Sequence, residues 1–244
     1  MIQIQHLSKA FTHPVLRNVT LSIPAGCLYG LIGPGASGKS VLLKMITALM
    51  RPDSGTLHVD GQDVTTLTEI DLSAFRLKFG MLFQNNALFD SMTVADNVAF
   101  PLRRLGQLDE AEIAERVRER LAAVSLGEFG DRNPQSLSGG QKKRVGVARA
   151  TVTRAPIIFY DEPAAGLDPV TSQKIFDLLR KEQESAQTTV IMVSSDIDRL
   201  LTVTDRIGMM YRGSLVFDGT TAEARGSDLP LVKQFIGGLS EGPL

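Results

Sequence analysis

The sequence has 244 residues, of which 43% are hydrophobic and 22% are charged, as is ordinary for a folded chain with a substantial core. Its 26 basic and 27 acidic side chains nearly cancel, so no global field attracts nucleic acid or an anionic membrane, and we expect no nucleic-acid partner. The single cysteine, Cys27, excludes an internal disulfide framework and a cysteine-based metal site, and we expect it to be a small buried residue.

The N-terminus, MIQIQHLSKAF, lacks the pattern of a signal peptide, and no window approaches the roughly 20 apolar residues of a spanning helix. Short apolar runs of strand type then recur along the chain, and helical patterns separate most of them. The predicted strands are 21–23, 28–32, 56–59, 80–83, 157–160, 190–193 and 207–211. Several are almost uniformly apolar, which predicts an α/β fold with a largely parallel sheet. The turn from Tyr211 to Ser214 predicts a hairpin near the end.

The predicted strand 28–32 runs into a glycine-rich motif that precedes a helical pattern at 41–46. The motif, G-x-x-x-x-G-K-[ST], consists of Gly33, Pro34, Gly35, Ala36, Ser37, Gly38, Lys39 and Ser40. Its glycines let backbone N–H groups curl around phosphate oxygens, and the helix adds the positive end of its dipole. We therefore expect Lys39 to contact the β and γ phosphates of a nucleotide and Ser40 to ligate Mg²⁺. The alternative is a glycine-rich turn that merely starts a helix.

Helical patterns dominate between about residues 85 and 155. Ile113, Val117, Leu121 and Val124 fall on one stripe, which predicts an amphipathic surface helix in a lobe inserted into the α/β core. The segment 137–141, LSGGQ, begins another helix, and its signature residues are Ser138, Gly139, Gly140 and Gln141. The serine and glutamine have the spacing of a capping box. The two glycines are costly in a first helical turn but leave N–H groups open to an anion, and both interpretations can hold at once.

Two later strands end in polar side chains. The strand 157–160 is followed by Asp161 and Glu162, and buried strands rarely end in adjacent acids without a cation or a reaction to serve. We expect Asp161 to bind Mg²⁺, directly or through one of the ion's other ligands, and Glu162 to polarise an attacking water as a general base. The alternative is a solvated acidic turn, which the phosphate loop disfavours. The strand 190–193 ends at Ser194, Ser195 and Asp196.

LSGGQ, GPGASGKS and IIFYDEP together resemble the motifs of ATP-binding-cassette (ABC) ATPases, and the resemblance extends from about residue 2 to 220. It implies a P-loop NTPase (RecA-like) core with an antiparallel β portion, a cassette at 1–220 with its helical subdomain at about 85–155, and a C-terminal extension at 221–244. It also implies ATP and Mg²⁺ as cofactors. Two copies would pair head to tail around two ATP molecules, each held by one phosphate loop and by the other copy's signature residues.

The resemblance assigns further roles. Phe11 matches an aromatic that stacks on adenine, although an ordinary core aromatic is the alternative. Gln84 matches a glutamine that senses Mg²⁺ and the water, and Asp168 an aspartate at the dimer interface. Ser195 stands where the family has a histidine that contacts the γ-phosphate. A serine hydroxyl is shorter and carries no positive charge, so we expect catalysis involving Ser195 to be slow unless it acts through a water. Asp196 fits the aspartate that usually follows the histidine.

A narrower resemblance concerns segments 80–89, GMLFQNNALF, and 96–102, DNVAFPL, which are similar to the Mla-type cassette of phospholipid trafficking in Gram-negative bacteria. It implies a cytoplasmic subunit peripheral to the inner membrane, which contacts the membrane only through permease subunits. An MCE-type substrate-binding protein and a small STAS-type subunit would be further partners. The first segment lies where cassettes receive the permease. For about half of four apolar residues in the two segments, simple core packing of the helical lobe is the alternative; the four are Leu88, Phe89, Val98 and Phe100.

The tail at 232–243 is similar to the C-terminal extension of the same subgroup. Its pairs Leu231 and Phe235, and Val232 and Ile236, predict a short amphipathic helix that helps dimerise or docks a partner. Other functions remain open: an ATP-gated assembly module with very slow hydrolysis, or a cassette for another lipid or hydrophobic solute. Cassettes of DNA repair or translation are disfavoured, because the chain has no room for a long coiled coil or a second cassette.

Overall fold

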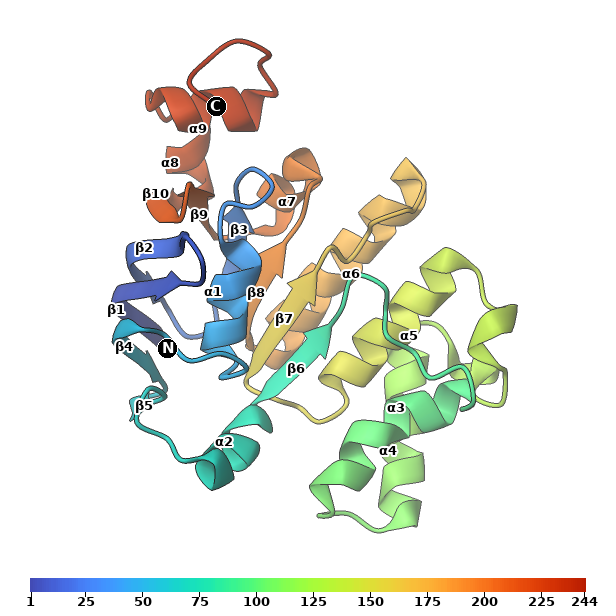
Figure 1. Cartoon of the computed structure of the whole chain (residues 1–244). Helices are drawn as coiled ribbons and strands as arrows, with labels where there is room; N and C mark the ends of the chain where they lie inside the picture. The colour runs from blue at the N-terminus through green and yellow to red at the C-terminus, as the bar shows by residue number, and fades with distance from the viewer. The chain divides into compact units, whose positions relative to one another are not determined.

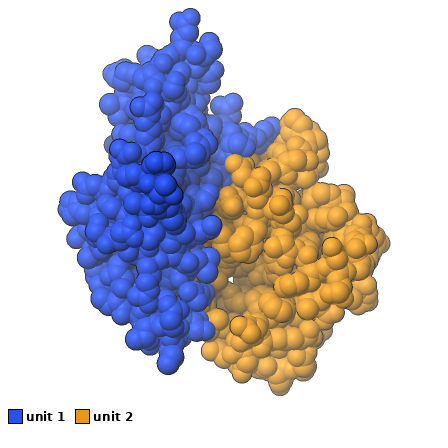
Figure 2. All heavy atoms as spheres, viewed as in Figure 1, with its two compact units in different colours: residues 1–76, 189–244 blue, residues 77–188 orange.

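The computed structural model describes residues 1–244, which form two compact units (Figure 1, Figure 2). Unit 1 comprises residues 1–76 and 189–244, and unit 2 comprises residues 77–188. Both units combine strands with helices, and the predicted α/β fold with mixed sheets is confirmed. No helix combines the length and the apolar character that crossing a membrane requires.

Unit 1 contains strands from two sheets. An antiparallel set has the order β2-β1-β4-β5, with bounds Ile2–Ala10 for β1, Pro14–Ile23 for β2, Ser54–Val59 for β4 and Gln62–Asp63 for β5. A second set has the order β10-β9-β3-β8, with bounds Leu28–Ile32 for β3, Thr189–Val193 for β8, Arg206–Tyr211 for β9 and Ser214–Thr220 for β10. Strand β3 is parallel to both β8 and β9. Every residue of β3 and β8 is buried, as the uniformly apolar runs predict.

The helices of unit 1 are α1 Lys39–Ile46, α2 Glu69–Arg76, α7 Ile197–Val203, α8 Thr221–Arg225 and α9 Pro230–Gly237. The predicted C-terminal amphipathic helix is therefore present as α9, in which Val232 is buried. The predicted hairpin joins β9 to the antiparallel β10, and its turn residues Arg212 and Gly213 both have positive φ, 47° and 84°. Two such residues match the right-handed twist of the flanking strands. Cys27 is buried, as expected.

The first strand shows how a local irregularity corrects a register. In the IQIQ start of β1, Ile2 and Ile4 are buried while the glutamines are exposed, as strand alternation requires. Continued alternation would bury His6. Instead His6 has φ of 53°, the pairing with β2 shifts between Ile4 and Leu7, and Leu7 is buried. The bulge moves an apolar side chain, rather than an imidazole, into the core.

Unit 2 contains the parallel strands β6 Phe79–Leu82 and β7 Ile157–Asp161. Its helices are α3 Val94–Leu105, α4 Glu110–Ala123, α5 Gly139–Thr151 and α6 Pro169–Ala186, with short 3₁₀ segments at Gly127–Phe129 and Pro134–Ser136. The predicted stripe Ile113, Val117, Leu121 and Val124 is buried throughout. The predicted strand 80–83 ends one residue earlier, at Leu82, because Phe83 turns out to the surface.

Strand β6 lies unusually close to α5, and two glycines make this possible. A Cβ on Gly80 would lie 1.9 Å from the carbonyl oxygen of Ala150, and a Cβ on Gly146 would lie 2.4 Å from Leu82 Cδ1. Neither distance is compatible with a real methyl group, so the two glycines set the spacing between the strand and the helix.

We predict that Gly80→Ala lowers the free energy of unfolding by about 1–3 kcal/mol, the usual cost of overpacking a dense core. The measurement is urea denaturation of the purified chain. Gly127→Ala is the matched control, because its Cβ would meet no atom closer than 3.8 Å, and it should change the free energy by less than about 0.5 kcal/mol. Equal effects of the two substitutions would contradict the proposed close contact.

Candidate functional site

The phosphate loop in unit 1 is shaped by residues that tolerate unusual backbone angles. Gly33 and Gly38 have φ of 140° and 104°, and Ala36 also has positive φ, 58°. A Cβ on Gly33 would lie 2.1 Å from the carbonyl oxygen of Met210, so no other residue fits there without a shift. The loop therefore requires glycine at Gly33 for two independent reasons, its conformation and its close contact with β9.

The helix that follows the loop starts without a side-chain cap, which suits an anion. Gly38 is the N-cap of α1 and offers no side-chain hydrogen bond, and the first turn contains no acidic residue. Most helices here start differently, for example α3, whose first turn is capped by Thr93. The N-cap of α1 therefore supplies no side-chain acceptor to the first turn, and a phosphate is a ligand that suits such a helix start.

Lys39 lies at the same helix start. Its Nζ donates to the carbonyl oxygens of Gly33 at 2.7 Å and Pro34 at 2.8 Å, so the ammonium lies within the curve of the loop. Ser40 is exposed in the first turn of α1. The loop thus combines backbone N–H groups, a helix dipole and a cation, which is the donor set that a polyphosphate requires.

Ser195 is in unit 1 as well, at the end of β8. Because β8 is parallel to β3, the carboxyl ends of these strands meet at one edge, where the phosphate loop also begins. Ser194 is buried, and its Oγ accepts a hydrogen bond from the Asp196 N–H at 3.1 Å. Asp196 caps α7 and pairs with Arg199. These two neighbours therefore have structural roles, whereas Ser195 itself is exposed at the edge.

Phe11 lies between β1 and β2 and is 58% exposed, so the alternative of an ordinary core aromatic is wrong. The Lys9 ammonium lies 5.7 Å from the centroid of its ring. An exposed aromatic face of this kind is available for stacking on a planar ligand.

In unit 2 the two predicted acids and Gln84 lie at one edge of the β6–β7 pair. The strands are parallel, and Leu82 pairs with Tyr160, so Gln84 follows one strand end where Asp161 and Glu162 follow the other. Asp161 and Glu162 are both half-buried. Glu162 has φ of 46°, an uncommon conformation for a residue with a side chain, and such strain concentrates at functional sites.

Lys143 joins these strand ends and was not predicted from the sequence. It is only 3% exposed, and its Nζ donates to the carbonyl oxygens of Gln84 at 2.5 Å and Glu162 at 3.1 Å. Burial lowers the pKa of its ammonium, and the charges of Glu162 and Asp161 oppose that shift. One signal was available: Lys143 lies on the same helical stripe as Val147 and Ala150, both buried, so its position predicts burial.

The signature residues form the start of α5. Ser138 is the N-cap, and the predicted capping box with Gln141 is present. Packing also favours glycine at these two positions, which the sequence did not reveal. A Cβ on Gly140 would lie 2.7 Å from Thr171 Cγ2, and one on Gly139 would lie 3.2 Å from Leu167 Cδ2. Close packing against the segment at the start of α6 therefore also favours glycine here.

Asp168 lies in that packed segment and is the N-cap of α6. Its carboxylate accepts hydrogen bonds from the N–H groups of Val170 and Thr171, both at 3.0 Å. Hydrogen bonds from Thr171, first through its side chain and then through its N–H, lower the pKa of Asp168. The carboxylate is therefore charged and oriented, and its predicted interface role stays a prediction.

The predicted Mg²⁺ ligands belong to different units, Ser40 to unit 1 and Gln84 and Asp161 to unit 2. No group of three or more histidine, cysteine or acidic side chains forms a ready-made metal site.

The helical part of unit 2 bears a groove of about 330 Å³ that is lined by aromatic side chains, and we call it the aromatic groove. Its lining includes Phe83, Phe89 and Phe100, which are 42%, 40% and 36% exposed. The rings of Phe89 and Phe100 are in contact, with centroids 4.8 Å apart. Val98 is fully buried, so the core alternative holds for Val98 but not for the two phenylalanines.

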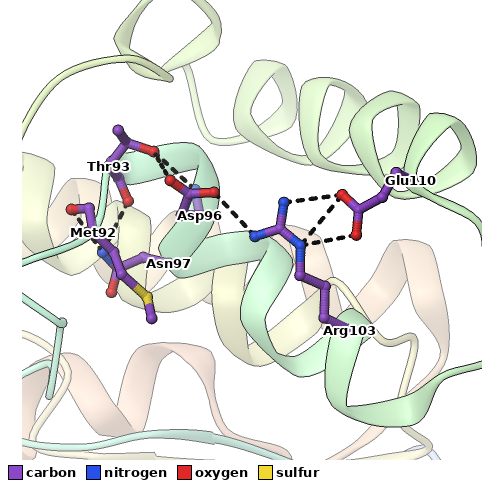
Figure 3. A network of polar contacts seen from close by, with 6 residues as sticks. All are labelled: Met92, Thr93, Asp96, Asn97, Arg103 and Glu110. Carbon is purple, nitrogen blue, oxygen red and sulfur yellow. Dashed lines mark hydrogen bonds and ion pairs between the residues drawn. The ribbon is translucent and has the colours of Figure 1, made fainter.

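A polar network around α3 holds the loop that carries Phe89, and Figure 3 shows the part of it between Met92 and Glu110. Asn97 is fully buried, accepts a hydrogen bond from the Phe89 N–H and donates to the carbonyl oxygens of Phe89 and Thr93. Arg103 bridges Asp96 on its own helix to Glu110 on α4 (Figure 3). Hydrogen bonds from Thr93 and Arg103 lower the pKa of Asp96. The network fixes the backbone that presents Phe89.

The chain matches the ABC transporter family over residues 16–165, more than half of its length. The chain belongs to the ABC transporter family. It is 41% identical to the probable ribonucleotide transport ATP-binding protein mkl of Mycobacterium tuberculosis, over all of this chain and 68% of that protein. It is also 40% identical to the methionine import ATP-binding protein MetN 1 of Pseudomonas putida, over 91% of this chain and 68% of that protein.

Solved structures of ABC cassettes have the same fold. The dimeric cassette MJ0796 in a post-hydrolysis state with ADP and Pi matches with a TM-score of 0.82 and 32% identity, over 91% of this chain and 99% of that one. The cassette cbiO1 of Clostridium perfringens matches with a TM-score of 0.86 and 27% identity, over 93% and 90%. This ABC chain is therefore the ATP-binding subunit of a transporter and an ABC-type ATPase.

Proposed function

We propose that this ABC ATPase powers the movement of phospholipid between the inner and outer membranes. The observation that carries the proposal is the aromatic groove, because segments 80–89 and 96–102, which resemble Mla-type cassettes, supply Phe83, Phe89 and Phe100 to it. The relatives named above are described as transporting ribonucleotide and methionine. A different lipid or a hydrophobic solute is the second candidate for the cargo.

In the proposed cycle, two copies pair head to tail around two ATP molecules. Phe11 stacks on the adenine, the N–H groups of the phosphate loop bind the phosphates, and Lys39 contacts the β and γ phosphates. The N–H groups that follow Ser138 of the partner subunit bind the same γ-phosphate, and Asp168 lies at the interface. The start of α1, which has no side-chain cap, and the glycine-rich start of α5 support this division of roles.

Hydrolysis is assigned to the residues of unit 2. Glu162 polarises the attacking water as a general base, while Gln84 orients that water and senses the metal. Ser40, Gln84 and Asp161 would hold Mg²⁺, which when bound would neutralise charge on the phosphates. Work arises because ATP and ADP favour closed and open dimers differently.

The aromatic groove would receive a cytoplasmic segment of the permease subunits. Three partly exposed phenylalanines provide apolar area. The Asn97 network keeps the loop of Phe89 in one conformation, which lowers the entropy cost of docking. In this proposal the chain lies on the cytoplasmic side of the inner membrane and contacts it only through the permease. An MCE-type protein and a STAS-type subunit complete the assembly.

We predict that Phe100→Glu weakens binding to the permease by roughly 30-fold, about 2 kcal/mol, because it removes an apolar anchor and adds a charge that must be desolvated. The affinity of the purified subunits in detergent checks this. Ile70→Glu on α2 is the matched control, since Ile70 is 85% exposed and outside the aromatic groove, and it should leave the affinity unchanged. Equal losses would exclude the groove as the docking surface.

The cargo is tested by purifying the chain with its permease and identifying bound molecules by mass spectrometry. We expect phospholipid to be enriched over the surrounding detergent-extracted membrane. Enrichment of another lipid or of a hydrophobic solute, with no phospholipid, would support the second candidate and reject the phospholipid proposal.

Ser195 supports a second hypothesis, that ATP binds and closes the dimer normally but is hydrolysed slowly. The side chain is exposed at the edge where the phosphate loop begins, but it is shorter than an imidazole and carries no positive charge. In the extreme case the chain acts as an ATP-gated assembly module. A single-turnover measurement of ATP hydrolysis distinguishes this assembly module from an ATPase that powers transport.

We predict that Ser195→His raises steady-state ATP turnover of the assembled transporter by about 10²–10³-fold, the usual worth of one preorganised contact in a transition state. ATP affinity should change little, because the phosphate loop is untouched. Ser195→Ala is the control, and its rate should match the parent unless the hydroxyl acts through a water. Turnover of Ser195→His within a fewfold of the parent would defeat the hypothesis.

A further inference from the structure

Lys143 is a buried cation whose contacts are with the main chain. Its ammonium donates to the carbonyl oxygens of Gln84 and Glu162, and these residues follow two different strands of unit 2. A buried ammonium is costly unless hydrogen bonds satisfy it, so its retention at 3% exposure indicates a specific task. The task available to Lys143 is to fix the distance between these two strand ends.

The carbonyl of Glu162 belongs to a strained residue. Its φ of 46° is unfavourable for any residue with a Cβ, so neighbouring contacts must maintain it. Among these contacts, the carbonyl oxygen of Glu162 accepts hydrogen bonds from Lys143 Nζ at 3.1 Å and from the Ala165 N–H at 3.2 Å. The backbone angle of Glu162 sets the direction of its side chain. Loss of the lysine would therefore free the carboxylate to point elsewhere.

The same helix holds the other strand end at further points. Arg149 donates to the carbonyl oxygens of Asn86 and Ala87, which have φ of 60° and 49°. The segment after Gln84 is thus tied to α5 by two cations, Lys143 and Arg149. Since α5 begins at Gly139 and β6 packs tightly on it through Gly80, any displacement of the signature residues is transmitted to Gln84 and Glu162.

We propose that Lys143 is a positioning residue that couples the signature helix to hydrolysis: through two carbonyl groups it fixes Gln84 and Glu162 relative to the start of α5. When the signature residues of a chain bind the nucleotide held by the partner copy, the same movement then aligns Gln84 and Glu162 of that chain on its own nucleotide. The inference rests on the proposed roles of Gln84 and Glu162, but the geometry of the contact does not.

The kinetic test uses Lys143→Met, which keeps the length and apolar stem of the side chain and removes its donors. We expect kcat for ATP in the assembled transporter to fall by about 10- to 100-fold, the usual range for misplacing catalytic groups, while the dissociation constant for ATP changes by less than about twofold. Lys174→Met is the matched control, because Lys174 is exposed on α6, and it should leave both values unchanged.

A multiple variant distinguishes positioning of Gln84 and Glu162 from a general defect. In a background with both Gln84→Ala and Glu162→Gln, the two groups that Lys143 positions are already lost, so adding Lys143→Met should lower the residual rate by less than about twofold. A further tenfold loss would overturn the proposal. Lys143→Gln retains two N–H donors and is the milder variant if the methionine variant does not fold; we expect its kcat to lie between those of the parent and Lys143→Met.

Amide hydrogen exchange tests the contact without reference to hydrolysis. Lys143→Met should speed exchange in segments 83–88 and 161–166, and the Lys174→Met control should not. Faster exchange together with an unchanged kcat would retain the positioning contact and reject its link to the proposed catalytic roles of Gln84 and Glu162. Unchanged exchange in both segments would reject the role of Lys143, whatever the activity of the parent.

Discussion

Close packing of α5 on β6 is the constraint on which the rest of unit 2 depends. A strand and a helix can approach this closely only where side chains are absent, and Gly80 and Gly146 provide those two places. The approach brings Lys143 and Arg149 within hydrogen-bonding distance of carbonyl groups that follow β6. One helix therefore carries the signature residues at its start and the supports of the strained turns along its length.

The chain uses glycine-rich helix starts in two chemically different ways. At α1 the N-cap is Gly38, which supplies no side-chain cap, the first turn contains no acidic residue, and the N–H groups suit the concentrated charge of a polyphosphate. At α5 the N-cap is Ser138, whose side chain already accepts a hydrogen bond from Gln141, so fewer N–H groups are open. In the proposed cycle the first start binds the phosphates of a copy's own nucleotide, and the second binds the partner's nucleotide only when the two copies close.

Several carboxylates near the proposed nucleotide sites already have structural tasks. Asp168 caps α6, and Asp196 caps α7 while it pairs with Arg199. Such groups are oriented before any ligand binds, which lowers the cost of a second role. Glu162 differs, because it has an uncommon backbone angle and its carbonyl oxygen is held by Lys143, while the proposed cycle assigns its carboxylate to the attacking water.

The sequence by itself determined the features that depend on neighbours within about ten residues. The α/β class, the phosphate loop between β3 and α1, the buried stripe of α4 and the capping box at Ser138 all follow from local periodicity and local hydrogen bonds, and each is present in the fold. The roles of the individual site residues remain predictions, because they depend on a ligand and a second copy.

Only the tertiary structure decided the features that depend on distant segments. The exposure of Phe11, the split between buried Val98 and the exposed phenylalanines, and the bulge at His6 depend on what packs alongside, which periodicity does not encode. Lys143 is the clearest example. Its partner carbonyls lie 59 and 19 residues away along the chain, and no side-chain pattern reports on a hydrogen bond to the backbone of a remote residue.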